Sequence, residues 1–252
     1  MPLLEEIKLA AQDCFERAAQ QLAAASLPPP RPPEPILRTR QELARLPPQP
    51  DRLAALQAAA SPLFEAARPL LEALARMPAQ IDPTKVEVVN RRLVGEVASF
   101  QAVCKDARIR TEYIVSASYV LCTALDESVS DSLLGVGGAQ PAAANPWMDR
   151  SLAVHFHGDR EGGAKVFRLV GRLVIEPQAH IDLLELVFAV FTLGFEGAYR
   201  HGYNGRRELD NMRHQIRSLV SNCRKNDTAQ VFAHWQWVER FIYNPDAYFA
   251  GA

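Results

Sequence analysis

The chain has 252 residues, of which 48% are hydrophobic and 23% are charged, and its formal net charge is -1. These values are typical of a soluble globular protein with one large domain or two small ones, and they exclude a global electrostatic attraction to nucleic acid or to an anionic membrane. The four cysteines are far apart and form no CxxC pair, which favours buried reduced thiols over a zinc or redox site. We expect no cofactor.

The first 60 residues divide into a helix and a spacer. Residues 1–25 carry an apolar face at helical spacing and predict an amphipathic N-terminal helix. Nine of the 18 prolines lie between Pro28 and Pro50, and proline removes backbone donors and favours an extended chain. Residues 26–60 are therefore predicted to be a Pro-rich linker, with a proline-rich ligand for a groove-binding domain as the alternative.

Helical periodicity dominates the rest of the chain, and no window alternates as a strand does. Ser61-Pro62 is a helix-start signal, so we expect the main helical domain at 61–223, followed by an aromatic helix and tail at 224–252. The most apolar segment, 180–195, is expected to be the central helix of a bundle. The predicted class is all-α. Helices are expected at residues 61–77, 84–106, 113–134, 162–176, 180–195, 206–222 and 229–243.

An acidic pair, Asp126-Glu127, lies near the end of the apolar helix predicted at 113–134. Ionised carboxylates are rarely fully buried unless they are paired, so water in a cleft, a basic partner or helix N-termini must stabilise them. Adjacent residues on a helix point about 100° apart and do not converge on one substrate atom, which disfavours acid-base catalysis. The pair is therefore interpreted as a recognition or fold-locking element.

Two shorter motifs have weak chemical interpretations. His155 and His157 could share a metal ion in a strand, but no third ligand is near in the sequence, so a structural role is favoured and no metal site is expected. Gly162-Gly163 resembles half of a phosphate loop without the preceding strand or the GK[ST] end, which favours a helix start with close packing.

The apolar helix ends at the segment Gly194–Arg200. Either Gly197 is a left-handed cap and Tyr199 folds back onto the core, or the helix simply terminates there. Glu196 and Arg200 either form an ion pair or line a surface.

The predicted helix at 206–222 has a basic face. This basic face is either solvated, or binds RNA, or contacts a membrane or an acidic partner. Interleaved stacking aromatics are absent, which argues against RNA, and no nucleic-acid partner is expected. The positive residues are Arg206, Arg207, Arg213, His214, Arg217, Arg224 and Lys225.

Four sequence pieces occur in the order and spacing of a known family. The run Ser118–Glu127 (SYVLCTALDE) resembles the family pattern "ARYALCALLDE", and FHG at 156–158 before Gly162-Gly163 resembles "FHGE..GG..FF". HIDLLEL at 180–186 with GFEGAYR at 194–200 resembles "HLDLLELMYLCLSLGFEGRYR". Leu209 and Ile216 resemble the tail "L..LR..LY..I". Over residues 60–223 the chain resembles the DotU/TssL (IcmH-like) family of type VI and type IVB secretion systems.

This resemblance implies a hook-like fold of two packed helical bundles, about seven to eight helices without a sheet. It implies no enzyme but an accessory protein at the cytoplasmic face of the bacterial inner membrane, which joins TssM (IcmF-like) and TssJ and docks the baseplate proteins TssK and TssE. The acidic pair Asp126 and Glu127 then lies at the docking cleft. The loop that follows, stretched here relative to the family, is a second contact candidate through Gly135, Gly137, Gly138 and Trp147.

The end of the chain departs from the family pattern. Its members usually end in one transmembrane helix, whereas the end of this chain is too short and too charged to span a bilayer, so no such helix is expected here. The basic face formed by Arg206, Arg207, Arg213 and Arg217 fits a membrane-proximal segment.

The alternatives are a type IVB DotU-like stabiliser of an IcmF-like partner and a helical enzyme with a cleft carboxylate at Glu127. A homodimer is one option for its assembly.

Overall fold

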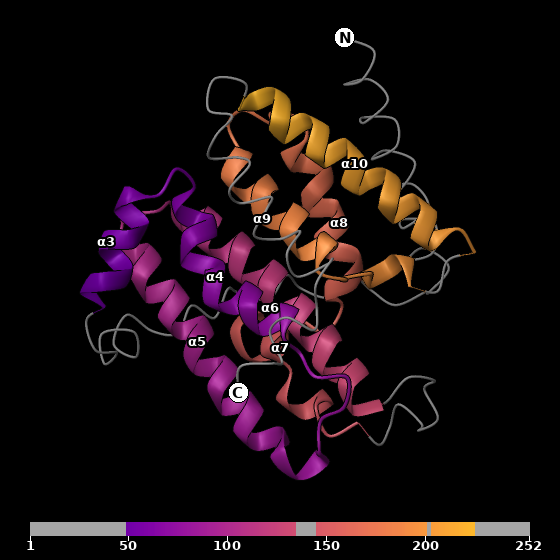
Figure 1. The fold of residues 1–252 in the computed structure, drawn as a ribbon. Coiled ribbons are helices and arrows are strands. Elements are labelled where there is room, and N and C mark those ends of the chain that lie inside the picture. Colours follow the sequence, from indigo (N-terminus) through magenta and orange to yellow (C-terminus); the bar gives the residue numbers. More distant parts are fainter. Residues whose placement is uncertain (1–48, 135–144, 201–202, 225–252) are drawn as a thin grey trace, which may run out of the picture.

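The computed structural model describes residues 49–134, 145–200 and 203–224 (Figure 1). All regular elements in these three ranges are helical, which confirms the predicted all-α class. The predicted N-terminal helix, most of the Pro-rich linker, the glycines of the 135–147 loop and the predicted helix at 229–243 lie outside the described residues. In order, the elements are α3 Pro50–Ala58, α4 Pro62–Ala75, η1 Pro83–Lys85, α5 Val86–Asp106, α6 Thr111–Leu134, η3 Met148–Arg150, α7 Leu152–His157, α8 Gly162–Leu173, α9 Ile181–Thr192, η4 Gly197–Tyr199 and α10 Gly205–Cys223.

Helix α6 is the hub of the fold. It packs against α4, α5, α7, α8 and α9 and lies in the middle of the described helices (Figure 1). Its side chains Ile114, Leu125 and Val129 share one face and Val120 lies on another, and all four are buried. Helix α9, predicted to be central, contacts α4, α6, α8 and α10 and is also largely buried. Apolar periodicity identifies both helices as covered, but it cannot say which neighbours cover them.

Helix α3 corrects the predicted linker, because residues 50–58 of the 26–60 segment are helical. Pro50 occupies the first turn, where a missing N–H costs no hydrogen bond. Leu56 is buried, and the guanidinium of Arg52 binds Glu96 and Ser99 of α5. Pro50, the last proline of the predicted linker, therefore marks the start of a helix.

Helix α8 begins where its backbone crosses α6 closely. A Cβ added at Gly162 would lie 2.5 Å from Thr123 Cγ2, and one at Gly163 would lie 3.3 Å from Ala198 N. The predicted role of the glycine pair in a helix start with close packing is confirmed.

No helix in the described part of the chain has both the length and the apolar character that a membrane span requires.

Candidate functional site

The carboxylate of Asp126 is bound by four donors, none of which is charged. Trp147 Nε1 and Leu152 N donate to Oδ1 at 2.8 and 2.7 Å. Ser151 Oγ and Ala153 N donate to Oδ2 at 2.6 and 2.8 Å. Leu152 and Ala153 open α7, and the first N–H groups of a helix have no acceptor within it. Asp126 therefore completes the N-terminus of α7 from a neighbouring helix.

The carboxylate of Glu127 is bound at a different place, the turn that precedes η4. Glu196 N and Gly197 N donate to its two oxygens at 2.8 and 2.9 Å, and Arg200 forms an ion pair with it at 3.2 Å. Gly197 has a φ of 51°, and a Cβ there would lie 2.8 Å from the ring of Phe195. The turn that presents both N–H groups to Glu127 therefore depends on glycine.

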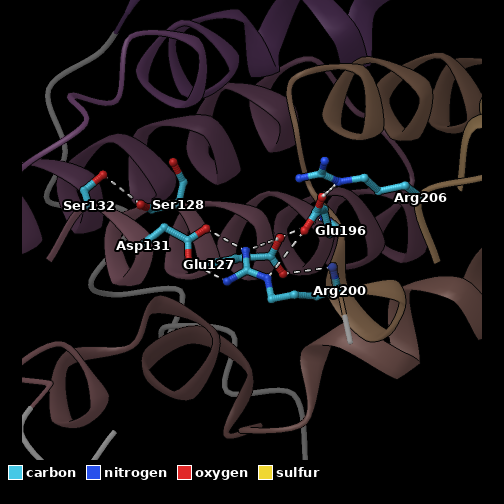
Figure 2. A network of polar contacts seen from close by, with 8 residues as sticks. Glu127, Ser128, Asp131, Ser132, Glu196, Arg200 and Arg206 are labelled. Atoms are coloured by element: carbon cyan, nitrogen blue, oxygen red, sulfur yellow. Dashed lines mark hydrogen bonds and ion pairs between the residues drawn. The ribbon is translucent and has the colours of Figure 1, made fainter. Parts of the chain in front are cut away.

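Arg200 binds three carboxylates, two from α6 and one from the turn before η4 (Figure 2). Its guanidinium binds both oxygens of Asp131, with Nη2 to Oδ2 at 2.6 Å, and lies 3.2 Å from Glu127 and 3.7 Å from Glu196. Arg206, at the start of α10, approaches Glu196 at 3.6 Å. Three carboxylates and two guanidinium groups give this cluster, hereafter the Arg200 cluster, a net charge of -1.

Burial and hydrogen bonding act in opposite directions on the pair. Burial raises the pKa of Asp126, while Ser151, the two backbone N–H groups and the indole N–H oppose the rise. Burial also raises the pKa of Glu127, against the N–H of Glu196, the charge of Arg200 and the N–H of Gly197. The hydrogen bonds thus compensate part of the cost of holding two carboxylates among apolar helices.

The family described as "Type VI secretion system protein DotU" matches residues 62–245. The chain belongs to this DotU family. Among solved structures, it is similar to TssL from Vibrio cholerae, with 28% sequence identity and a TM-score of 0.56, and the match covers 64% of this chain and 96% of that one. No curated protein matches the chain.

The family match confirms the resemblance expected from residues 60–223 and extends it past the end of α10. Membership in the DotU family implies a component of the membrane complex of a type VI secretion system, and members of this family are structural components of that system.

Two of the three stabilisers expected for the acidic pair of this DotU chain are present. Backbone N–H groups at the starts of α7 and η4 bind Asp126 and Glu127, and a basic residue, Arg200, also binds Glu127. The carboxylate oxygens therefore have donors within the chain, and contact of this pair with a partner stays a prediction. Trp147 is buried and donates to Asp126, so the loop that it ends is anchored beside the pair.

The glycine that ends α9 is Gly194, because its φ is 108° and Phe195 N bonds to Val190 O across it. Gly197, expected as a left-handed cap, serves the turn before η4 instead. Tyr199 folds back onto Phe167, with ring centroids 4.6 Å apart, as one of the two alternatives predicted.

A buried polar chain between α5, α6 and α7 escaped the sequence analysis. Gln101 Nε2 donates to Ser118 Oγ at 3.0 Å, and Ser118 Oγ lies 3.1 Å from His157 Nε2. Burial lowers the pKa of His157 to about 4, so this imidazole is neutral near pH 7. A serine beside a neutral histidine resembles a nucleophile with its base, but Ser118 is fully buried and no substrate reaches it. Gln101 and Ser118 occupy core positions of apolar helices, and this was the sequence signal that could have predicted the polar chain.

The two histidines of α7 point in different directions. His157 is buried, while His155 is exposed and its ring lies edge-on to Phe156. Within the described ranges, no group of three or more histidine, cysteine or acidic side chains could hold a metal ion.

The basic residues of α10 differ in exposure and in ion-pair partners, which the sequence did not predict. Arg206, Arg207 and Arg217 are exposed, whereas the side chain of Arg213 is only 27% exposed and binds Asp210 at 2.7 Å. Arg224 turns inward and binds Glu185 and Asp182 of α9 at 2.9 and 2.8 Å, so its assignment to the basic face was wrong. The helical pattern could not reveal these acidic partners on α9.

Proposed function

We propose that this chain is a docking subunit that links the TssM and TssJ assembly of the inner membrane to the baseplate proteins TssK and TssE. It acts at the cytoplasmic face of that membrane. The match to the DotU family over residues 62–245 and the similarity to TssL from Vibrio cholerae support a role within this machine.

The Arg200 cluster is the surface that best suits a baseplate contact. The side chains of Asp131 and Glu196 are 48% and 28% exposed, whereas Glu127 between them is 16% exposed. Carboxylates outnumber guanidinium groups here, so the surface favours a basic partner. This exposure of Asp131 and Glu196 beside a half-buried, anchored Glu127 is the observation that carries the proposed location.

Asp126 and Glu127 serve this contact by holding the surface in place. Glu127 fixes the turn that carries Glu196, and Asp126 fixes Trp147 at the end of the 135–147 loop. The loop glycines Gly135, Gly137 and Gly138 remain part of the proposal as a second contact.

The test is co-purification of the chain with TssK, TssE and TssM from the same organism. We would compare the wild type with two double variants, Asp131→Asn/Glu196→Gln at the more accessible carboxylates and Asp126→Asn/Glu127→Gln at the anchored pair. The first variant should lose only about 1 kcal/mol of stability, as expected for exposed ion pairs, and at least about tenfold in affinity for a baseplate protein. The second should lose stability as well as binding.

The matched control is Glu87→Gln/Asp149→Asn, which removes two exposed carboxylates from α5 and η3. It should bind as the wild type does. Equal binding by the wild type and the Asp131/Glu196 variant would move the contact to the 135–147 loop or to α10. A folded wild type that retains none of the three partners would contradict the docking function itself.

A further inference from the structure

Helix α10 presents an exposed basic row on the outside of the molecule. It runs along one edge, with its inner side packed on α9 (Figure 1). The side chain of Arg206 is 92% exposed, and Arg207 and Arg217 are also exposed. Arg206 and Arg217 are eleven residues apart, which is about 16 Å along the helix axis. A row of this length can touch a flat surface at several points together.

The charge of this helix differs from that of the whole chain. Within α10, four arginines stand against Glu208 and Asp210, a balance of +2 with neutral histidine, whereas the chain as a whole carries -1. Asp210 is bound by the half-buried Arg213. Glu196 is 3.6 Å from Arg206, a long and exposed ion pair that weakens the attraction of Arg206 for other anions without cancelling it. At about 0.15 M salt, charges act over roughly 8 Å, so a contacting surface senses this local excess.

The shape and composition of this surface select among anionic partners. Besides Tyr203, which is fully exposed just before α10, no large exposed apolar side chain of the described residues lies on this helix. Single-stranded nucleic acid would need several stacking aromatics along the row, whereas the described part of this helix offers only Tyr203 at its start. A charged row with one aromatic ring at its end instead suits the interfacial zone of a bilayer, where tyrosine and arginine both accumulate.

We propose that the exposed face of α10, through Arg206, Arg207, Arg217 and Tyr203, binds the anionic phospholipid headgroups of a membrane, with the helix lying along the bilayer surface. This contact is independent of the docking function, because it requires only the chain and lipid. Each arginine near an anionic surface contributes about a fivefold change in affinity. Removal of three should weaken binding by more than tenfold, after allowance for Glu196.

The test is sedimentation of the full chain with vesicles of phosphatidylcholine alone or of equimolar phosphatidylcholine and phosphatidylglycerol. We expect binding only to the anionic vesicles, with a decline as salt rises. The variant Arg206→Gln/Arg207→Gln/Arg217→Gln should lose it. Tyr203→Ser should weaken it by a smaller factor and leave the salt dependence unchanged.

The matched control, Lys85→Gln/Arg91→Gln/Arg92→Gln, removes the same charge from exposed residues at the start of α5. It should bind as the wild type does, and circular dichroism should give both triple variants the wild-type helix content. Absence of binding by the wild type, an equal loss in both triple variants, or binding that ignores salt would overturn the proposal. Retention on RNA that exceeds retention on anionic vesicles would reassign the face to nucleic acid.

Discussion

Helix α6 is joined to the rest of the fold at two junctions that begin at adjacent residues and differ in chemistry. At the α7 junction, four neutral donors surround Asp126, and all four come from residues 147–153. At the η4 junction, two N–H groups and one guanidinium bind Glu127, and Arg200 also binds Asp131. Among the described residues, the donors of the first junction share the single carboxylate of Asp126, whereas the second junction has a further carboxylate that can keep Arg200 in place.

The largest effect should follow Asp126→Asn. An amide offers one oxygen and turns an N–H2 group toward donors, so at least two of the four donors lose their acceptor. Groups left unsatisfied when buried cost about 1–3 kcal/mol each, and we expect the free energy of unfolding to fall by about 4 kcal/mol in urea titrations.

Asp149→Asn is the control for this change, because Asp149 is an exposed carboxylate in η3, close in sequence to the donors. It should alter the free energy of unfolding by less than about 0.5 kcal/mol. Similar losses in the two variants would show that the α7 junction is not held by Asp126.

The α7 junction should also be sensitive to acid through His157. Its folded pKa is about 4, below the ordinary value of 6.5, because burial disfavours the charged ring. Between these values the unfolded chain binds a proton that the folded chain does not. Stability is therefore complete above pH 6.5 and falls as the pH drops toward 4, by about 3 kcal/mol at 1.36 kcal/mol per pKa unit.

The measurement is urea unfolding between pH 7 and pH 4 for the wild type, His157→Gln and His155→Gln. Only His157→Gln should remove the loss of about 3 kcal/mol, since His155 is exposed. An unchanged pH profile in His157→Gln would place the acid sensitivity at another group, and the raised pKa values of Asp126 and Glu127 exclude those two carboxyls as its source.

The sequence predicted the long helices on either side of the two junctions, but not the contacts within the junctions. The apolar spacing of α5, α6 and α8 predicted helices within two or three residues of those observed, because burial of one helical face depends on local periodicity. Helix α7 has six residues, too few for that signal, and it was missed. The sequence could name helix N-termini as one way to stabilise Asp126 and Glu127. The donors themselves come from 21 to 27 and from 69 to 70 residues away, and only the packing of α7 and η4 on α6 identifies them.

A smaller effect is expected for Glu127→Gln. The amide oxygen can still accept one N–H of the turn before η4, and Arg200 keeps Asp131. We expect a loss of about 2 kcal/mol in the free energy of unfolding, roughly half that of Asp126→Asn. A loss equal to or larger than that of Asp126→Asn would contradict the redundancy assigned to the Arg200 cluster.

The smallest effect should come from Asp131→Asn, and its salt dependence sharpens the comparison. Asp131 is about half exposed, and exposed ion pairs contribute about 0.2–1 kcal/mol, a contribution that salt screens. We expect a loss of about 0.5 kcal/mol at low ionic strength that disappears in 1 M salt, whereas the loss from Asp126→Asn should stay nearly constant because its donors are neutral. Because both values come from the same urea titrations, a salt-dependent loss for Asp126→Asn would erase the distinction between the two junctions. In that case long-range charge, and not donor geometry, would hold α7 on α6.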